Sequence, residues 1–542
     1  MHRRGEQHRL ISGSRVTAFG TLVSRVLGML RDAATAALFG LSGGGVMDAF
    51  VLAFRIPNLF RRLFGEGVLA ASYLPVLSAA LERDRAEAWK LVSAVLLRLA
   101  VGLTALVAAG EVVLGAVALA GNGDPEIQRF TVLAAIMLPY ALFICLAAQA
   151  AATLHALGRF ALPASIPTIL NLVWLAAAVF VAPWYSSDKV VQAQVMAVAI
   201  VAAGVVQFSV QIPALRRNGF QFDYNPEAVQ HELRQIARAM GPMVLGLMVT
   251  QINTLMDSVI AWLLAAPDAA KTTIGWLGGV SYPMEQGAVA ALYYGERLYQ
   301  FPLGILGIAV ATAIFPLLSR HAARNDHASL SEDLTLGLRL VLFLGIPAGV
   351  GLVMLAEPLA RLLYERREFT SEDTVRTARV IWSYALGVWA YCALPVLVRG
   401  YYALGDRLTP VRVGVTVVAV NFCLNLALIW PLAEAGLAVA TSIGASLQVA
   451  ILAVVFSRQN LPIRWRAMTA TVLRTLVATS AMAAGCYGSA WLLPPGSGLV
   501  ASLLGVLVPF GVAVIAFLAT ARMLRAPELS LLLSRSSALK GQ

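Results

Sequence analysis

A small set of charged and amide side chains lies inside long apolar segments of this sequence, and this set could bind a ligand. The segments are 15–39, 47–81 and 286–319, and the set consists of Arg25, Arg31, Asp48, Arg55, Asn58, Arg61, Glu66 and Arg297. A guanidinium group stays charged and presents a planar fork that holds two phosphate oxygens at once. Because arginines outnumber carboxylates in this set, a cavity that they line is predicted to bind a polyanion such as a diphosphate.

The spacing of these residues places several of them on one helix face. Asp48, Arg55 and Arg62 are seven residues apart and share one stripe of a helix. Arg25 and Asp32 have the same spacing on the preceding segment, where the carboxylate would neutralise a cation. Two interpretations remain open, because charges inside a membrane either face a cavity or pair with one another, and arginines near a helix end can extend to lipid headgroups.

The composition identifies the elements that must hold these residues as membrane helices. Of 542 residues, 59% are hydrophobic and 13% are charged, whereas soluble domains have about 25% charged residues. A set of soluble domains is therefore excluded. A bilayer is crossed by roughly 20 apolar helical residues, and such runs predict fourteen helices near 15–39, 47–81, 88–120, 127–157, 161–183, 190–215, 234–265, 286–319, 333–364, 375–403, 409–431, 435–457, 468–493 and 498–523. Because lipid cannot satisfy open backbone groups, the predicted fold is an all-α polytopic membrane protein.

The basic residues predict how the chain is oriented in the membrane. Lys and Arg number 41 against 29 Asp and Glu, which gives a net charge of +12. Most of the basic residues in loops lie on one side of the predicted membrane, for example near 83–90, 216–238 and 458–466. By the positive-inside rule, both termini are predicted to be cytoplasmic.

Two internal matches indicate that the chain is duplicated. Residues 73–78 (YLPVLS) are similar to residues 314–319 (IFPLLS) at an offset of 241, and residues 156–163 (ALGRFALP) recur as residues 403–410 (ALGDRLTP) at an offset of 247. Parallel repeats of this kind occur in transporters. The predicted domains are an N-lobe (1–218), a C-lobe (219–464) and two additional helices with a tail (465–542).

The two equivalent helices 47–81 and 286–319 are predicted to be interrupted. The first contains Pro57 and the sequence Gly65-Glu66-Gly67, and the second contains Pro302, Gly304 and Gly307. Proline removes a helical hydrogen bond, and a broken helix is tolerated in a membrane where it faces protein or a wet cavity. Both helices are therefore expected to line a cavity.

Three segments carry a resemblance to a known family. The runs SRVLGMLRD (24–32), DAFVLAFRIPNLFRRLFGEGVLAASYLPVL (48–77) and YYGERLYQFPLGILGIAVATAIFPLLS (293–319) resemble the MurJ/MviN family of bacterial lipid II flippases, in the multidrug/oligosaccharidyl-lipid/polysaccharide exporter superfamily. The resemblance covers essentially the whole chain. It implies two six-helix lobes around a central cationic cavity, and a groove for the undecaprenyl tail in helices 13 and 14. It also implies essential cavity residues, which are Arg25, Arg31, Asp48, Asn58, Arg61 and Arg297, with Glu66 in a portal segment.

The sequence departs from this family at two positions. Some relatives have an acidic residue at the position of Gln300, and some have a small hydroxyl at the position of Ala290. The resemblance also implies a sodium site in some relatives, which here would use Asp257, Asn421, Asn425 and Thr441. Such oxygen ligands suit a hard cation, but buried amides also hydrogen-bond across helices as packing contacts, so both interpretations remain open.

The resemblance implies a transporter that needs no covalent chemistry and requires no cofactor, with a sodium ion as an optional ligand. It would carry lipid II, an undecaprenyl-diphosphate-linked disaccharide pentapeptide, across the bacterial cytoplasmic membrane by alternating access, with the membrane potential as a driving force. It would contact membrane lipids and act as a monomer, with cell-wall synthesis or regulatory proteins as further partners.

Other function classes are less compatible with the sequence. A multidrug exporter would have a cavity with dominant negative charge, and a polysaccharide-unit exporter would lack the motif match. A prenyl-diphosphate transferase would need clustered carboxylates for magnesium, and no loop contains an aspartate-rich motif. Nucleic-acid binding has no support in the sequence, because no loop is long enough to form a domain. The four cysteines lie in apolar runs without a CxxC pair, which indicates neither a disulfide framework nor a zinc site.

Overall fold

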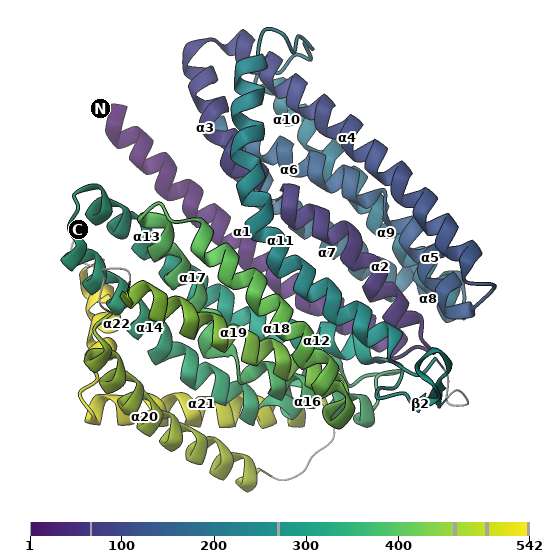
Figure 1. The fold of residues 1–542 in the computed structure, drawn as a ribbon, viewed down its shortest axis with the longest axis vertical. Helices are drawn as coiled ribbons and strands as arrows, with labels where there is room; N and C mark the ends of the chain where they lie inside the picture. The colour runs from purple at the N-terminus through teal and green to yellow at the C-terminus, as the bar shows by residue number, and fades with distance from the viewer. Residues whose placement is uncertain (1, 66–67, 268–271, 459–462, 494–497, 539–542) are drawn as a thin grey trace. The chain divides into compact units, whose positions relative to one another are not determined.

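A computed structural model describes residues 2–65, 68–267, 272–458, 463–493 and 498–538 of the chain (Figure 1). Helices make up almost all of it, which confirms the predicted all-α membrane fold. In these ranges the sheet structure is limited to a short antiparallel hairpin of β1 (Thr273–Ile274) and β2 (Val280–Ser281). The chain divides into two compact units, which are described in turn.

The first unit contains Met1–Leu263, Pro267–Thr272 and Arg366–Phe369. Its helices are α1 (His2–Phe39), α2 (Val46–Phe60), α3 (Val68–Arg83), α4 (Arg85–Ala120), α5 (Pro125–Met137), α6 (Tyr140–Ala156), α7 (Ala161–Ala176), α8 (Ala182–Tyr185), α9 (Lys189–Ser209), α10 (Gln211–Arg217) and α11 (Gln230–Leu263). Two π-helical segments interrupt them, η1 (Arg61–Gly65) between α2 and α3 and η2 (Ala177–Val181) between α7 and α8.

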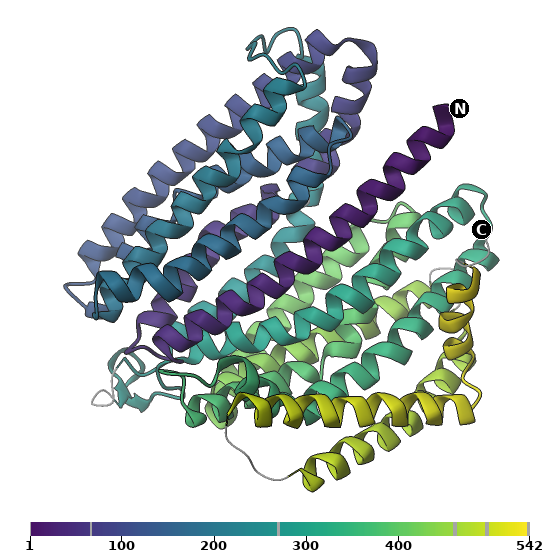
Figure 2. The same cartoon turned by 180° about the vertical axis from the view of Figure 1, so that it is seen from behind.

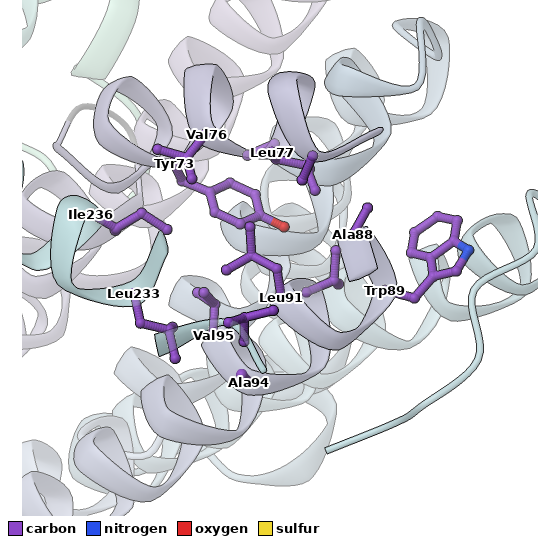
Figure 3. Close-up of a cluster of buried hydrophobic side chains, with 14 residues drawn as sticks. Tyr73, Val76, Leu77, Ala88, Trp89, Leu91, Ala94, Val95, Leu233 and Ile236 are labelled. Atoms are coloured by element: carbon purple, nitrogen blue, oxygen red, sulfur yellow. The ribbon is translucent and has the colours of Figure 1, made fainter. Parts of the chain in front are cut away.

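Apolar side chains hold α3, α4 and α11 together at one end of the first unit. Tyr73 and Leu77 on α3 are fully buried against Leu91 on α4, and Leu233 and Ile236 on α11 complete the cluster (Figure 3). Aspartates stabilise the helix starts in this unit, since Asp84, Asp124 and Asp188 each accept a hydrogen bond from a backbone nitrogen of the first turn of α4, α5 and α9. The turns between the apolar runs are thus specified locally.

The second unit contains Leu264–Ala266, Thr273–Glu365 and Thr370–Gln542. After the hairpin, which includes the 3-10 turn η3 (Gly275–Leu277), come α12 (Ala288–Pro302), the π-helical segment η4 (Leu303–Gly307), α13 (Ile308–Ala323), α14 (His327–Met354), α15 (Ala356–Tyr364), α16 (Ser371–Ala385), α17 (Val388–Ala403), α18 (Leu408–Leu432), α19 (Glu434–Arg458), α20 (Trp465–Leu492), α21 (Leu499–Met523) and α22 (Pro527–Ala538).

The last two long helices pack against the same partner. α20 and α21 lie side by side (Figure 1 and Figure 2), and α20 also packs along α14. Their contact is apolar, with Phe343 of α14, Met482 of α20 and Phe517 of α21 in one buried cluster. This pair corresponds to the two additional helices predicted for residues 465–542, while the lobe boundaries at 218 and 464 remain predictions.

Among the described residues, ten helical stretches are long and apolar enough to cross a membrane, or eleven if α16 and α17 form one bent span. The predicted count of fourteen therefore remains a prediction. Four segments predicted as single helices each consist of two helices, namely 127–157, 190–215, 333–364 and 375–403. Pro139 lies at the break in 127–157 and Gly387 at the break in 375–403, and neither residue continues a helix well. The expected interruptions of helices 47–81 and 286–319 are confirmed as the π-helical segments η1 and η4.

Candidate functional site

Arg31 lies at the centre of a polar network in the first unit. Its Nη2 and Nε donate hydrogen bonds to Asp32 Oδ1 at 2.7 and 3.0 Å, and its Nη1 donates to Asn171 Oδ1 at 3.1 Å. The guanidinium carbon lies 4.4 Å from the centre of the Trp174 ring, in a cation-π contact. Arg31 and Asp32 are only 7% and 3% exposed. The cation that Asp32 neutralises is therefore its neighbour Arg31.

A second layer of contacts fixes this network between α1, α2 and α7. Asn171 Nδ2 donates to the carbonyl oxygen of Ser24 at 2.8 Å, and Trp174 Nε1 donates to Thr35 Oγ1 at 3.0 Å. The rings of Phe50 and Phe54 meet the Trp174 ring edge to face, with centroids 5.5 and 4.9 Å away. Arg31 is consequently held in a defined orientation by α7, and α2 supports that arrangement by packing against Trp174.

The arginines on one stripe of α2 and η1 both contact α11. Arg55 Nη1 donates to the carbonyl oxygen of Thr254 at 3.4 Å, and Arg62 Nη1 donates to Gln251 Oε1 at 3.2 Å. This agrees with the seven-residue spacing, which predicted a shared face. Asp48, at the start of the same stripe, is 3% exposed.

Arg61 lies beside this stripe in the sequence and is oriented by an amide. Its Nε donates to Asn58 Oδ1 at 2.9 Å, across one helical turn. Arg61 and Asn58 are both partly buried, as is Arg25 on α1. Glu66 lies outside the described residues.

Arg297 belongs to the second unit and has its own network on α12. Its guanidinium carbon lies 4.5 Å from the centre of the Tyr293 ring. Its Nη1 donates to Gln300 Oε1 at 3.5 Å, and Gln300 Nε2 donates to Glu296 Oε1 at 2.7 Å. Gln300, at the position that is acidic in some relatives, therefore links Arg297 to the buried carboxylate of Glu296, which lies one helical turn before Gln300.

The residues of the predicted sodium site are divided between the units. Asp257, which accepts a hydrogen bond from Asn253 Nδ2 at 3.3 Å, belongs to the first unit. Asn421 and Asn425 are buried on α18 in the second unit, and Thr441 Oγ1 donates to the carbonyl oxygen of Leu437 on α19. Each part has buried oxygen atoms of the expected kind, and their assembly into one site remains a prediction.

The sequence analysis did not predict the side chains that orient the arginines. Asn171 and Trp174 lie about 140 positions beyond Arg31 in the chain, and no spacing rule connects them to it. The signal that could have indicated Asn171 is its type, because an amide inside an apolar run must find a partner. Glu296, which the sequence analysis did not assign to the site, takes part in the network of Arg297.

Ten helical stretches that could cross a membrane, together with arginines oriented by polar and aromatic neighbours, are typical of a polytopic membrane transporter. The sequence comparisons give its family. The model of the family "Lipid II flippase MurJ" matches residues 35–506. The chain is 35% identical over 458 residues to the probable lipid II flippase MurJ of Vibrio cholerae, covering 82% of each chain, and 32% identical over 442 residues to the lipid II flippase MurJ of Burkholderia cenocepacia, covering 80% of this chain and 81% of the other. The protein belongs to the MurJ family.

Solved structures share its fold. One described as "Lipid II flippase MurJ, inward closed conformation" matches with a TM-score of 0.72 at 24% identity, over 94% of this chain and 99% of the other. An inward-facing multidrug resistance transporter of the MATE family matches with a TM-score of 0.63 at 11% identity, over 82% of this chain and 95% of the other. These two likenesses show that the chain has the fold of these transporters.

Proposed function

We propose that this protein moves lipid II from the inner to the outer leaflet of the bacterial cytoplasmic membrane. Its membership of the MurJ family supports this substrate. The observation that carries the proposal further is the charge of residues 24–62, which contain five arginines and two aspartates and hence a net charge of +3. An excess of fixed cations inside a membrane protein is suited to an anionic headgroup.

The proposed substrate-binding residues are Arg25, Arg31, Asp48, Arg55, Asn58, Arg61, Glu66 and Arg297. In this proposal Asn58 aims the guanidinium of Arg61, and the Asp32 and Asn171 contacts aim that of Arg31, so that the forks meet the diphosphate with little loss of side-chain entropy. The tail of the lipid would remain in the membrane along α20 and α21. The pairing of α20 with α21 on α14 supports a role for them as one element.

Transport would follow alternating access, with the diphosphate released on the outer side. The interior of the cell is negative, and moving one charge across the membrane is worth about 2.3 kcal/mol per 100 mV. An anionic headgroup is thus driven outward by the membrane potential. No covalent step is part of this mechanism.

Several finer features belong to the same proposal. Both termini are cytoplasmic, as the basic loops suggest. Asp257, Asn421, Asn425 and Thr441 would hold a sodium ion through their side-chain oxygen atoms. The protein acts as a monomer in contact with membrane lipids, and cell-wall synthesis or regulatory proteins are its partners.

A depletion experiment tests the proposed substrate. In bacteria with no other lipid II flippase, depletion of this protein is expected to leave lipid II in the inner leaflet, and expression of the wild-type chain is expected to restore its appearance outside. Normal wall synthesis during depletion would contradict the proposal. Export of a cationic dye by the purified protein, without movement of lipid II, would favour the multidrug alternative.

A further inference from the structure

The two π-helical segments η1 and η4 occupy equivalent places in the duplicated halves. Each is five residues long, and Arg61–Gly65 becomes Leu303–Gly307 at a constant offset of 242. Each follows a helix with a proline near its end, which is Pro57 in α2 and Pro302 in α12. Each also interrupts one of the helices that carry intramembrane arginines. π-Helical turns insert an extra residue into the helical ladder and are frequent at functional sites.

A cysteine contacts each of these segments at the same atom. Cys145 Sγ on α6 lies 3.5 Å from the carbonyl oxygen of Phe60, and Cys392 Sγ on α17 lies 4.0 Å from the carbonyl oxygen of Pro302. Phe60 and Pro302 are the residues directly before η1 and η4. The two cysteines are 247 residues apart, which is the offset of the repeated sequence at 156–163 and 403–410. Both thiols are fully buried.

The geometry explains why a thiol suits this place. Carbonyl oxygens at a break in a membrane helix need additional donors, because no water is available in the bilayer core. A thiol is a weak donor and a small side chain. The close approach is clearest at η4, where a Cβ on Gly307 would lie 2.8 Å from the Cα of Cys392. A residue larger than cysteine at either position would push the π-helical segment away from the helix that carries the cysteine. A stronger hydrogen-bond donor there would hold the π-helical turn more tightly.

The other cysteines and the other π-helical segment lack this arrangement. Cys486 on α20 packs in an apolar cluster with Met482 and Phe517, and Cys423 is exposed on α18. Segment η2 interrupts α7 in the first half, whereas the equivalent helix α18 is continuous from Leu408 to Leu432. The thiol contact is therefore specific to the two π-helical segments that follow α2 and α12.

We propose that Cys145 and Cys392 are positioning residues for transport, one in each half. Each thiol holds its π-helical turn through the carbonyl at the start of that turn. Because the hydrogen bond from the thiol to the carbonyl oxygen is weak, the turn can open and re-form when α2 and α12 change shape during the transport cycle. The role in transport rests on the proposed flippase function, whereas the thiol contact itself does not.

Hydrogen–deuterium exchange of the full-length protein in nanodiscs, without substrate, tests the contact. In Cys145→Ala, amides of residues 61–65 are expected to exchange about two- to five-fold faster, the factor that corresponds to a weak hydrogen bond. Cys392→Ala is expected to do the same for residues 303–307. The serine variants Cys145→Ser and Cys392→Ser keep a donor and are expected to exchange at or below the wild-type rate, and Cys486→Ala is the matched control with a buried thiol elsewhere.

Three results would overturn the proposal at this stage: wild-type exchange in both alanine variants, equal acceleration by alanine and serine, or the same change in Cys486→Ala. The transport role is then measured as the initial rate of lipid II translocation in proteoliposomes. The serine variants, with a stronger donor, are expected to be slower than wild type although their segments stay protected. Wild-type rates in both would remove the transport role, and a wild-type protein that moves no lipid II would refute the proposed function while leaving the exchange result intact.

Discussion

Replacing Arg31 is expected to destabilise the protein as well as to weaken substrate binding. In Arg31→Ala, the carboxylate of Asp32, only 3% exposed, loses the two hydrogen bonds of its cation. Breaking a buried ion pair by removing one partner costs about 3–5 kcal/mol, and loss of the cation-π contact with Trp174 adds roughly 0.5–2 kcal/mol. The variant should therefore melt well below the wild-type protein in detergent.

The double variant Arg31→Met/Asp32→Asn separates the two effects. It removes both charges and keeps similar side-chain volumes, so that most of the lost stability should return, since replacing a whole buried pair is often neutral. Transport should not return, because the guanidinium is still missing. The assay is the melting temperature together with the rate of lipid II translocation for wild type, the single variant and the double variant. A single variant that melts like wild type would refute the reasoning about the pair, and a double variant with wild-type transport would refute a role of Arg31 in binding.

Three further predictions concern other residues of the second unit. Glu528 is fully buried and accepts hydrogen bonds from Arg339 at 2.6 and 3.0 Å. Glu528→Ala should therefore detach α22 from α14, and this detachment should be seen as faster limited proteolysis of α22. Hydrogen bonds at the start of α14 lower the pKa of Asp326. The carboxylate therefore stabilises the protein above the ordinary aspartate pKa, and this stabilisation is lost as the pH falls through the lowered pKa. The difference in melting temperature between wild type and Asp326→Ala should be constant near neutral pH and vanish in strong acid. Gln300→Glu should place a second carboxylate beside Glu296 and make translocation depend on pH, and a flat pH profile in this variant would contradict that expectation.

The sequence predicted those features that depend on local spacing and residue type. The seven-residue interval of Arg55 and Arg62 predicted a common face, and both contact α11. The prolines and glycines of helices 47–81 and 286–319 predicted their interruption. Motifs within residues 24–77 and 293–319 were enough to indicate the family.

Features that depend on tertiary packing could not be predicted in this way. The partners of Arg31 on α7 lie about 140 residues away, and only the folded chain brings them together. Asp32 was expected to neutralise a cation, but helical spacing suggested Arg25, while the structure pairs it with the adjacent Arg31. The sequence also could not predict that the two interruptions are π-helical, because proline and glycine weaken a helix without specifying a π-helical turn.

The central claim is that oriented arginines in the first unit bind the diphosphate of lipid II. The most direct test is the initial rate of lipid II translocation in proteoliposomes for Arg25→Ala and Arg61→Ala. Arg412→Ala, which changes an exposed arginine on α18, is the matched control. Loss of a charge-assisted hydrogen bond worth about 1.5–3 kcal/mol predicts rates roughly 10- to 100-fold below wild type, with an unchanged control. Wild-type rates in both variants, at equal amounts of folded protein, would contradict the account.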